Sequence, residues 1–434
     1  MPDGDEDGRP PSSVGVVRRA PFSDNPRVGA RGLRTQQRIL DAALHAFAEE
    51  GYHACTIDRI AKLARCSRVS FYQYFSGKAD VFLHLAGRVA RQVSAATEAL
   101  EPLTADAGGW SAMRAWVGRY ADLHDRYAPV FHALESDDLL AALACASGEE
   151  TVERIHARLA STTLPPRQLD PVIRLLLECI NHALDNTEIL RQAVPDAYAR
   201  GDVETALTDL VHRTLFGVLP EVNVHLITGA RPPALDFGPM MSEVLRPAGG
   251  YDDASRNPAF VALLASGRDV FVSLGYQSTR VDDLVAAAGV SHGAFYRYFE
   301  NKEQLARMLT ARSIVALGDS LVEMPDVLGD ESAGRSALRR WLRRYNAARV
   351  GEAGMVGVWL EAARHDPAIS AECAPLLDWG RRRLARYLEP RGFGDVDLDG
   401  VLLAALVGVF GARSRSSAET DAAAHVIERG FLGR

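Results

Sequence analysis

Apolar residues near the start of the chain recur at spacings of three and four, the period of an amphipathic helix. The stripe consists of Ile39, Leu40, Ala43, Leu44 and Phe47. It predicts a helix that begins near Arg34 and ends at Gly51, because glycine commonly terminates helices by adopting a left-handed backbone. The apolar face of this helix requires partners, which the following residues supply.

Two short helices are expected next, at 57–64 and 68–74. Thr56 and Ser67 precede them, and both residue types cap helix N-termini by accepting a backbone N–H. Two short helices joined by a tight turn are the helix-turn-helix arrangement. The same pattern recurs later in the chain, where helices are predicted at 259–274, 281–288 and 292–298.

An aromatic motif makes this repetition explicit. Phe71–Phe75 reads FYQYF and Phe295–Phe299 reads FYRYF, and a lysine follows each three positions later, at Lys78 and Lys302. Residues 51–81 align on 275–305 without gaps. Because the whole chain holds only three lysines, two at equivalent places indicate one structural unit that occurs twice.

The remainder of each half predicts helices, at 79–220 and 303–431, since no run alternates apolar and polar residues as strands do. The expected fold class is all-α. Helix breaks are expected at Pro102, Gly108, Gly109, Pro129, Gly148, Pro165, Pro166, Pro195, Pro325, Gly329, Gly351, Gly354, Pro367 and 390–394. The predicted organisation is a disordered tail at 1–30, a helix-turn-helix domain at 31–78, a larger helical domain at 79–227, a Pro- and Gly-rich linker at 228–258, a second helix-turn-helix domain at 259–302 and a second helical domain at 303–434.

Composition fits an intracellular protein of two globular units. The chain has 434 residues, a net charge of −7 and five cysteines without a C-x-x-C pair. Reduced thiols in a cytosol are therefore expected. The first residues are not typical of a secretory signal, and the apolar run 401–412 is too short to span a bilayer. We expect a cytoplasmic, nucleoid-associated protein with no membrane partner.

Side-chain chemistry in the repeat suits contact with phosphates. Phe71 and Phe75 lie four apart on one helical face and are predicted to be core. Tyr72 projects elsewhere, so its hydroxyl is free to reach a phosphate; the alternative is that it also packs in the core. Lys78 and Lys302 begin the next helix, where an ammonium group suits a phosphate oxygen. The alternative for each lysine is a solvated side chain.

The motif resembles the DNA-binding module of the tetracycline-repressor (TetR) family of transcription regulators. The second copy carries Ala288-Gly289-Val290-Ser291 and the first carries Ile60-Ala61, each followed by its aromatic motif and lysine. The resemblance covers about 45 residues in each copy. It implies a homodimer whose recognition helices enter successive major grooves, with larger domains that dimerise, hold a small-molecule effector and regulate DNA release.

The resemblance also implies which residues contact DNA. Residues on the recognition helices that would face bases are Arg68, Ser70, Gln73, His292, Ala294 and Arg297. Residues that would hold phosphates are Thr56, Tyr72, Tyr74, Lys78, Tyr296, Tyr298 and Lys302. A basic arm before the first module, with Arg34, Thr35 and Arg38, is also expected to lie along the DNA.

The two copies depart from the motif differently. Arg65 stands where the second copy has Gly289, a turn position that often needs a left-handed backbone, at a cost of about 1 kcal/mol for a non-glycine residue. Val69 stands where the second copy has Gly293. The second module lacks a comparable basic arm. Unequal DNA binding by the two modules is therefore expected.

The sequence thus predicts a sequence-specific, ligand-responsive transcriptional regulator, expected to be a repressor, with two TetR-like units in one chain. The chain acts either as a single-chain pseudo-dimer or as a homodimer with four modules. The alternative function is a ligand-binding or protein-interaction module whose helix-turn-helix units no longer bind DNA. No enzyme motif occurs, the twelve histidines show no metal-ligand spacing, and no cofactor is expected.

Overall fold

The computed structural model is helical throughout the part of the chain that it describes. These residues are 29–136, 138–159, 162–195, 197–217, 219–220, 234–235, 257–325 and 331–434. The described residues contain one isolated β-bridge, between Leu103 and Leu159, and no strand. The all-α prediction is confirmed. Residues 1–28 of the predicted tail and most of the predicted linker, 228–258, lie outside the described residues.

Three helices form each helix-turn-helix unit, which we call a head. Head 1 consists of α1 (Ala30–Ala54), α2 (Ile57–Leu63) and α3 (Arg68–Tyr74), and head 2 of α11 (Pro258–Leu274), α12 (Val281–Ala288) and α13 (His292–Tyr296). Helix α1 begins four residues earlier than predicted. Its helical geometry breaks at Gly51, with φ 74°, and Gly275 caps α11 with φ 75°. Both heads therefore end their first helix at the glycine that the sequence indicated.

Longer helices follow each head and form its body. The first body holds α4 (Lys78–Glu98), α5 (Ala107–Ser136), α6 (Asp138–Arg158), α7 (Pro166–Ala193) and α8 (Arg200–Phe216). The second holds α14 (Lys302–Val322), α15 (Glu331–Ala363), α16 (Pro367–Leu388), the 3-10 turn η2 (Glu389–Arg391), α17 (Val396–Ala412), α18 (Ser417–His425) and the π-helical turn η3 (Val426–Phe431). Helices α4 and α14 have the same length, 21 residues, so the repeat extends beyond the heads.

Several predicted breaks are wrong. Gly148 lies within α6, and Gly351 and Gly354 lie within α15. The predicted break at Pro129 corresponds to a kink in α5, since Tyr127 leaves helical geometry with φ −118° and ψ 22°. A glycine in a helix costs only about 1 kcal/mol, which packing readily offsets.

The glycines of α15 allow head 2 to approach its body closely. A Cβ atom added at Gly354 would lie 3.2 Å from the side chain of Val272 on α11. One added at Gly351 would lie 3.0 Å from Arg268 of the same helix. Small residues at these two positions therefore serve packing between α11 and α15, which explains their place inside a helix.

The two bodies share one hydrophobic core. Helix α17 packs against α7, α18 packs against α7, and η3 packs against α8. The four C-terminal helical segments thus form an intramolecular bundle, with α17 buried on nearly all sides. Polar contacts cross the same boundary, because Arg213 Nε donates to the carbonyl of Gly430 at 2.7 Å.

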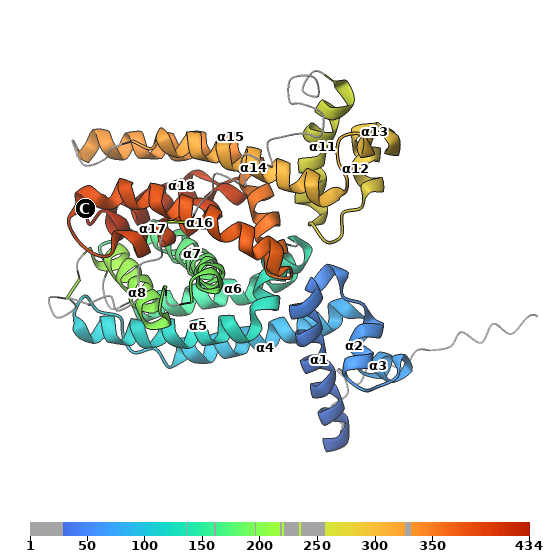
Figure 1. Cartoon of the computed structure of the whole chain (residues 1–434). Helices are drawn as coiled ribbons and strands as arrows, with labels where there is room; N and C mark the ends of the chain where they lie inside the picture. Colours follow the sequence, from blue (N-terminus) through green and yellow to red (C-terminus); the bar gives the residue numbers. More distant parts are fainter. Residues whose placement is uncertain are drawn as a thin grey trace, which may run out of the picture.

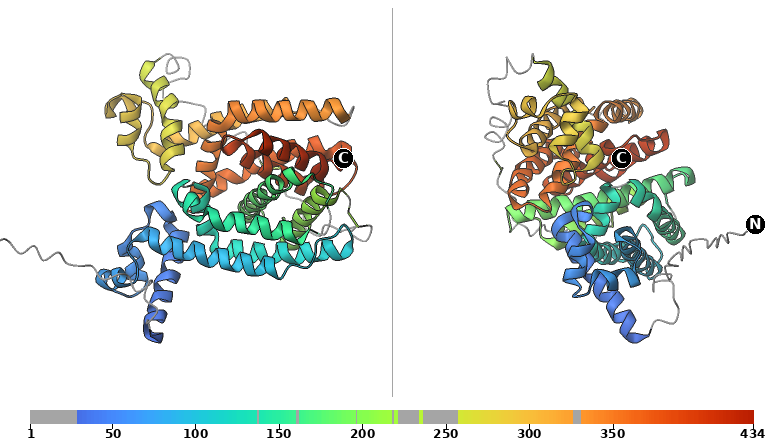
Figure 2. Two further views of the ribbon diagram at one scale, coloured as in Figure 1. Left: turned by 180° about the vertical axis from the view of Figure 1, so that it is seen from behind. Right: turned by 90° about the vertical axis from the view of Figure 1, so that its right-hand side faces the viewer.

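Both heads lie at one end of the joined bodies (Figure 1). Helices α4 and α14 run from the heads into the bodies. The bundle of α7, α8, α17 and α18 lies between these two helices. The views in Figure 2 agree that α3 and α13 lie on the side of the heads away from the bundle. Among the described residues, none of the helices has the length and apolar character needed to cross a membrane.

Candidate nucleic-acid interface

The local sequence of each head fixes its short helices. Thr56 Oγ1 accepts the backbone N–H of Arg59 at 3.2 Å and so caps α2. Ser67 Oγ accepts the N–H of Ser70 at 3.0 Å and caps α3. These are the caps that the sequence predicted, and they satisfy N–H groups that a helix leaves unpaired at its start.

The turn between the two short helices has the same geometry in both heads. Arg65 adopts a left-handed backbone with φ 50°, and Gly289 has φ 65°. The turn closes through the N–H of Cys66, which donates to Ala61 at 3.0 Å, and the N–H of Val290, which donates to Val285 at 3.0 Å. Head 1 therefore forms the same turn as head 2 but places a strained arginine in it, as the sequence predicted.

The recognition helices α3 and α13 each divide into a buried and an exposed face. Phe71, Phe75, Phe295 and Phe299 are all buried, which confirms their prediction as core. The exposed positions are Arg68, Val69, Tyr72 and Gln73 on α3, and His292, Gly293, Tyr296 and Arg297 on or directly after α13. Ser70 and Ala294 are half-buried. The exposed face in each head is the surface that a DNA groove would meet.

The first residue of each recognition helix pairs with an aspartate on the preceding helix. Arg68 lies 3.1 Å from Asp58, and His292 Nε2 lies 2.6 Å from Asp282 Oδ1. All four side chains are more than half exposed. Polar contacts this exposed are weak, so a DNA base or phosphate can displace the aspartate.

The predicted phosphate-contacting tyrosines differ in accessibility. Tyr72 is 41% exposed and Tyr296 is 57% exposed, so their hydroxyl groups are accessible. Tyr74 is half-buried, and Tyr298 is 7% exposed and packs on Phe260 with ring centroids 5.2 Å apart. Tyr72 and Tyr296 are therefore the better placed of the four predicted side chains.

The structure gives Lys78 and Lys302 a contact that the sequence did not predict. Each ammonium donates to three backbone carbonyls at the end of the first helix of its head. Lys78 Nζ lies 2.6, 3.0 and 3.0 Å from the carbonyl oxygens of Tyr52, His53 and Cys55. Lys302 Nζ makes the equivalent contacts at 2.7, 3.2 and 2.8 Å.

An ammonium has three donors, and this arrangement uses all of them. Burial lowers the pKa of both lysines, which is consistent with a position beneath the surface. The lysine therefore joins the end of the first helix to the start of α4 or α14. The predicted phosphate contact would need at least one of these bonds to break.

The predicted basic arm is part of α1. Arg34 and Arg38 are exposed on its first turns, and Thr35 Oγ1 donates to the carbonyl of Arg31 at 3.2 Å. The upstream arginines lie outside the described residues. Within the described residues, Arg34 and Arg38 are available to a phosphate, whereas Thr35 bonds within its own helix.

Two exposed residues of the heads were not predicted from the sequence to contact DNA. Val69, 72% exposed on α3, offers an apolar contact of the kind that reads a thymine methyl group. Arg280 is exposed at the start of α12, in the place that Thr56 has in head 1. The gap-free alignment of the two copies was the signal that could have identified Arg280.

Two three-helix units, each exposing the polar face of a recognition helix at one end of a helical body, define a tandem helix-turn-helix protein. The family model described as "Bacterial regulatory proteins, tetR family" matches it twice, at residues 39–85 and 263–309. The chain therefore carries the DNA-binding domain of this family in two copies.

Known relatives resemble parts of the chain. The transposon Tn10 TetC protein of Escherichia coli is 30% identical over 83 residues, which are 19% of this chain and 42% of that protein. The transcriptional repressor DhaR of Mycobacterium sp. (strain GP1) is 30% identical over 139 residues, 31% of this chain and 62% of that protein. The chain thus spans less than two thirds of either relative.

A solved structure of a tetR-family transcriptional regulator from Streptomyces coelicolor is 23% identical, with a TM-score of 0.34. The match covers 43% of this chain and 82% of that one.

Proposed function

We propose that this chain is a sequence-specific transcriptional regulator that binds one operator as a single-chain pseudo-dimer. The observation that carries the proposal is the shared bundle of α7, α8, α17 and α18, which joins two bodies whose heads lie at the same end (Figure 1). In this arrangement one chain supplies both DNA-reading heads. It would act on DNA in the bacterial cytoplasm.

The exposed faces of α3 and α13 support two different half-sites. Head 1 presents Gln73 where head 2 presents Arg297. Glutamine pairs with the edge of adenine in the major groove, and arginine pairs with guanine. The operator we propose is therefore non-palindromic, with half-sites about one helical turn apart.

A small apolar cavity in the first body, of about 30 Å³, marks where a small-molecule effector would bind if the surrounding helices moved apart. Its walls come from α5 to α8 and the segment after α4, and every lining side chain is apolar, including Met113, Trp116 and Ile173. Helix α4 belongs to this body, packs against α5 and α6, and also contacts α1 of head 1, so a ligand that spreads the body helices would move the head. We propose an apolar effector that releases the DNA, as in a repressor.

The test is the stoichiometry of the protein–DNA complex. The full chain is analysed by size-exclusion chromatography with light scattering, alone and with duplex DNA from the region upstream of its gene. We expect one chain per duplex and affinity that falls steeply as salt rises, because phosphate contacts release counterions. Two chains per duplex would overturn the pseudo-dimer.

Paired variants assign the contacts to each head. Gln73→Ala and Arg297→Ala should each weaken binding by about 1–3 kcal/mol and relax base preference in one half-site only. Arg91→Ala, an exposed change on α4 away from both recognition helices, is the matched control. If neither head variant changes binding to any duplex, the interaction-module alternative replaces the proposal.

A further inference from the structure

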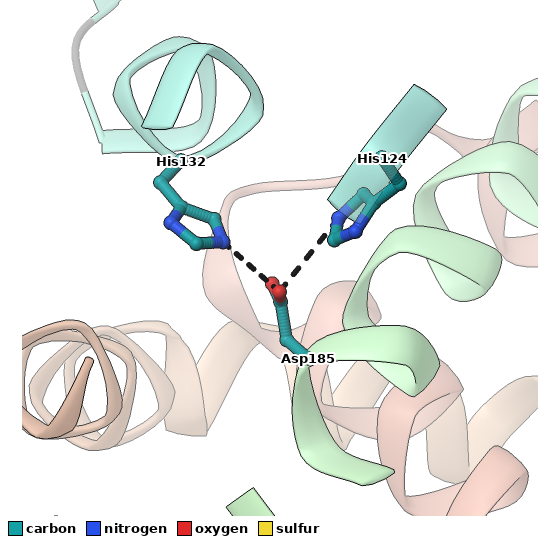
Figure 3. A group of neighbouring side chains, drawn as sticks. All are labelled: His124, His132 and Asp185. Atoms are coloured by element: carbon teal, nitrogen blue, oxygen red, sulfur yellow. Dashed lines mark hydrogen bonds and ion pairs between the residues drawn. The ribbon is translucent and has the colours of Figure 1, made fainter. Parts of the chain in front are cut away.

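Two histidines and an aspartate meet at the junction between the two bodies. His124 and His132 lie on α5, Asp185 lies on α7, and the three side chains point at one another (Figure 3). His132 Nε2 is 2.9 Å and His124 Nε2 is 3.7 Å from Asp185 Oδ1. All three possible ligand atoms lie within 4.8 Å of one another. They form a separate site from the DNA-reading surfaces.

The kink in α5 creates this cluster. Residues eight apart on a straight helix are separated by about 12 Å along its axis. The rings of His124 and His132 have centroids only 6.1 Å apart. Tyr127 and Pro129, where α5 bends, lie between them. The cluster could not be read from sequence spacing because it depends on this bend.

One atom of the cluster lacks a hydrogen-bond partner. His124 is 2% exposed, and its Nε2 makes no hydrogen bond. A buried polar atom without a partner costs about 1–3 kcal/mol, so its retention calls for an explanation. Burial lowers the pKa of both His124 and His132. Neutral imidazoles have the lone pair that metal coordination requires.

We propose that His124, His132 and Asp185 bind a divalent first-row transition-metal ion, with Zn²⁺ as the reference ion. Imidazole nitrogen with one carboxylate oxygen suits zinc and its neighbours, whereas Mg²⁺ and Ca²⁺ take oxygen ligands. Ligand atoms around tetrahedral zinc are roughly 3.3 Å apart, given bonds of about 2.0–2.1 Å. The two distances to Asp185 bracket this value, and small side-chain rotations complete the geometry.

The residues around the cluster give an ion access to it and orient the carboxylate of Asp185. His132 also lines a cavity of about 450 Å³, together with residues of α1 and with Arg364 and His365, which follow α15. This cavity gives an ion a path to the site and leaves a fourth position for water or another ligand. Arg364 Nη2 donates to Asp185 Oδ2 at 2.6 Å and so fixes the carboxylate, and an ion at Oδ1 would replace the hydrogen bond between Oδ1 and His132 Nε2. Its positive charge opposes the ion, which predicts that affinity is limited by Arg364.

The first experiment uses the full chain after removal of metals with a chelator. Zn²⁺ is titrated by calorimetry, Co²⁺ by visible absorption, and Mg²⁺ serves as the ion that should not bind. We expect one Zn²⁺ or Co²⁺ per chain, a Co²⁺ spectrum of nitrogen and oxygen coordination, and a higher melting temperature with Zn²⁺. Absence of stoichiometric Zn²⁺ binding by the folded chain would overturn the proposal.

Variants locate the ion. His124→Gln and His132→Gln should each lower Zn²⁺ affinity at least tenfold, with folding checked by circular dichroism. His156→Gln changes an exposed histidine on α6, outside both the cluster and the cavity, and should leave affinity unchanged. Arg364→Gln should increase affinity, because it removes a positive charge beside the site; a purely structural cluster would not respond in this way. Unchanged affinity in both His124→Gln and His132→Gln would place the ion elsewhere and refute the site.

Discussion

Arg65 is the residue at which the two heads differ most in backbone strain. It holds φ 50° in the turn where Gly289 holds φ 65°. We expect Arg65→Gly to stabilise head 1 by about 0.5–1 kcal/mol, because glycine removes the steric cost but adds entropy to the unfolded chain. Native-state hydrogen exchange of the amides in α2 and α3 measures the change locally.

The reciprocal variant Gly289→Arg is its control. It should destabilise head 2 by about 1–2 kcal/mol and leave exchange in head 1 unaltered. If Arg65→Gly speeds exchange in head 1, the arginine makes a stabilising contact that outweighs its strain.

A variant of Lys78 can distinguish a structural role of this lysine, and of the equivalent Lys302, from a contact with DNA. Lys78→Met keeps most of the side-chain volume but removes three charge-assisted hydrogen bonds to the end of α1. We expect a loss of about 1.5–3 kcal/mol in the local stability of head 1. The dependence of DNA affinity on salt should stay the same. A phosphate contact would instead reduce the slope of log affinity against log salt by about 0.9.

The sequence indicated that these two lysines matter but not what they contact. Repetition in a lysine-poor chain identifies a constrained position, whereas the direction of a long side chain depends on what lies near it in space. The carbonyls that Lys78 meets come from residues 23 to 26 positions earlier. Their approach is set by the break at Gly51 and the packing of α1 against α4, which periodicity does not reveal.

At the scale of elements, the short helices of the heads were predictable because local signals agree there. Caps, apolar spacing and the terminal glycine indicated consistent bounds, and α3 was placed correctly at 68–74, whereas α13 ends at Tyr296, two residues before its predicted end. Predictions of helix breaks failed where tertiary packing decides. Gly354 was predicted to break a helix, yet it lies inside α15. The close approach of Val272 of α11 leaves no room for a larger side chain at this position.

The start of α18 should make the bundle sensitive to acid. Burial alone would raise the pKa of Glu419, but its bonds from Ser416 and its pairing with Arg415 and Arg413 outweigh burial and lower the pKa to about 2. The unfolded chain then binds the proton first as pH falls. Stability from this carboxylate is full above about pH 4.5 and is lost towards pH 2.

Glu419→Gln tests that contribution. In urea unfolding followed between pH 6 and pH 3, the variant should be less stable than the natural chain at pH 6 by about 1–2 kcal/mol, a value reduced for solvent screening. The difference should shrink as the pH falls. Glu389→Gln, at an exposed carboxylate, should not change this profile. If the difference in stability between the two proteins does not vary with pH, the contacts of residue 419 with Ser416 and Arg415 do not depend on the negative charge of the carboxylate.

At the scale of the whole molecule, the shared bundle should hold the halves together without the covalent connection. A protease site inserted in the predicted linker 228–258 would separate the halves covalently. Because α7 and α17 are buried against each other, we expect the two fragments to elute together with the mass of one intact chain. Fragments that elute separately would mean that the contact is too weak to unite the bodies. An unrelated site inserted in residues 1–28 controls for the protease.

The sequence predicted this bundle only as one of two architectures. Apolar helices at the end of each half require partners, but a partner in the same chain and one in a second chain leave the same hydrophobic pattern. The contact of Cys179 Sγ with the carbonyl of Leu402, 3.6 Å apart in the described structure, lies inside the chain. The choice depends on the length and path of the connection, which composition alone does not determine.

The two heads are encoded by different parts of one gene, and this affects how the protein evolves. In a homodimer, one codon specifies the same side chain in both heads, so a single mutation alters recognition at two places together. Here Gln73 and Arg297 are encoded by two different codons, so a mutation changes one without the other. If both heads read DNA as we propose, the preference of one head for its half-site can therefore change by mutation while the other head keeps its own preference.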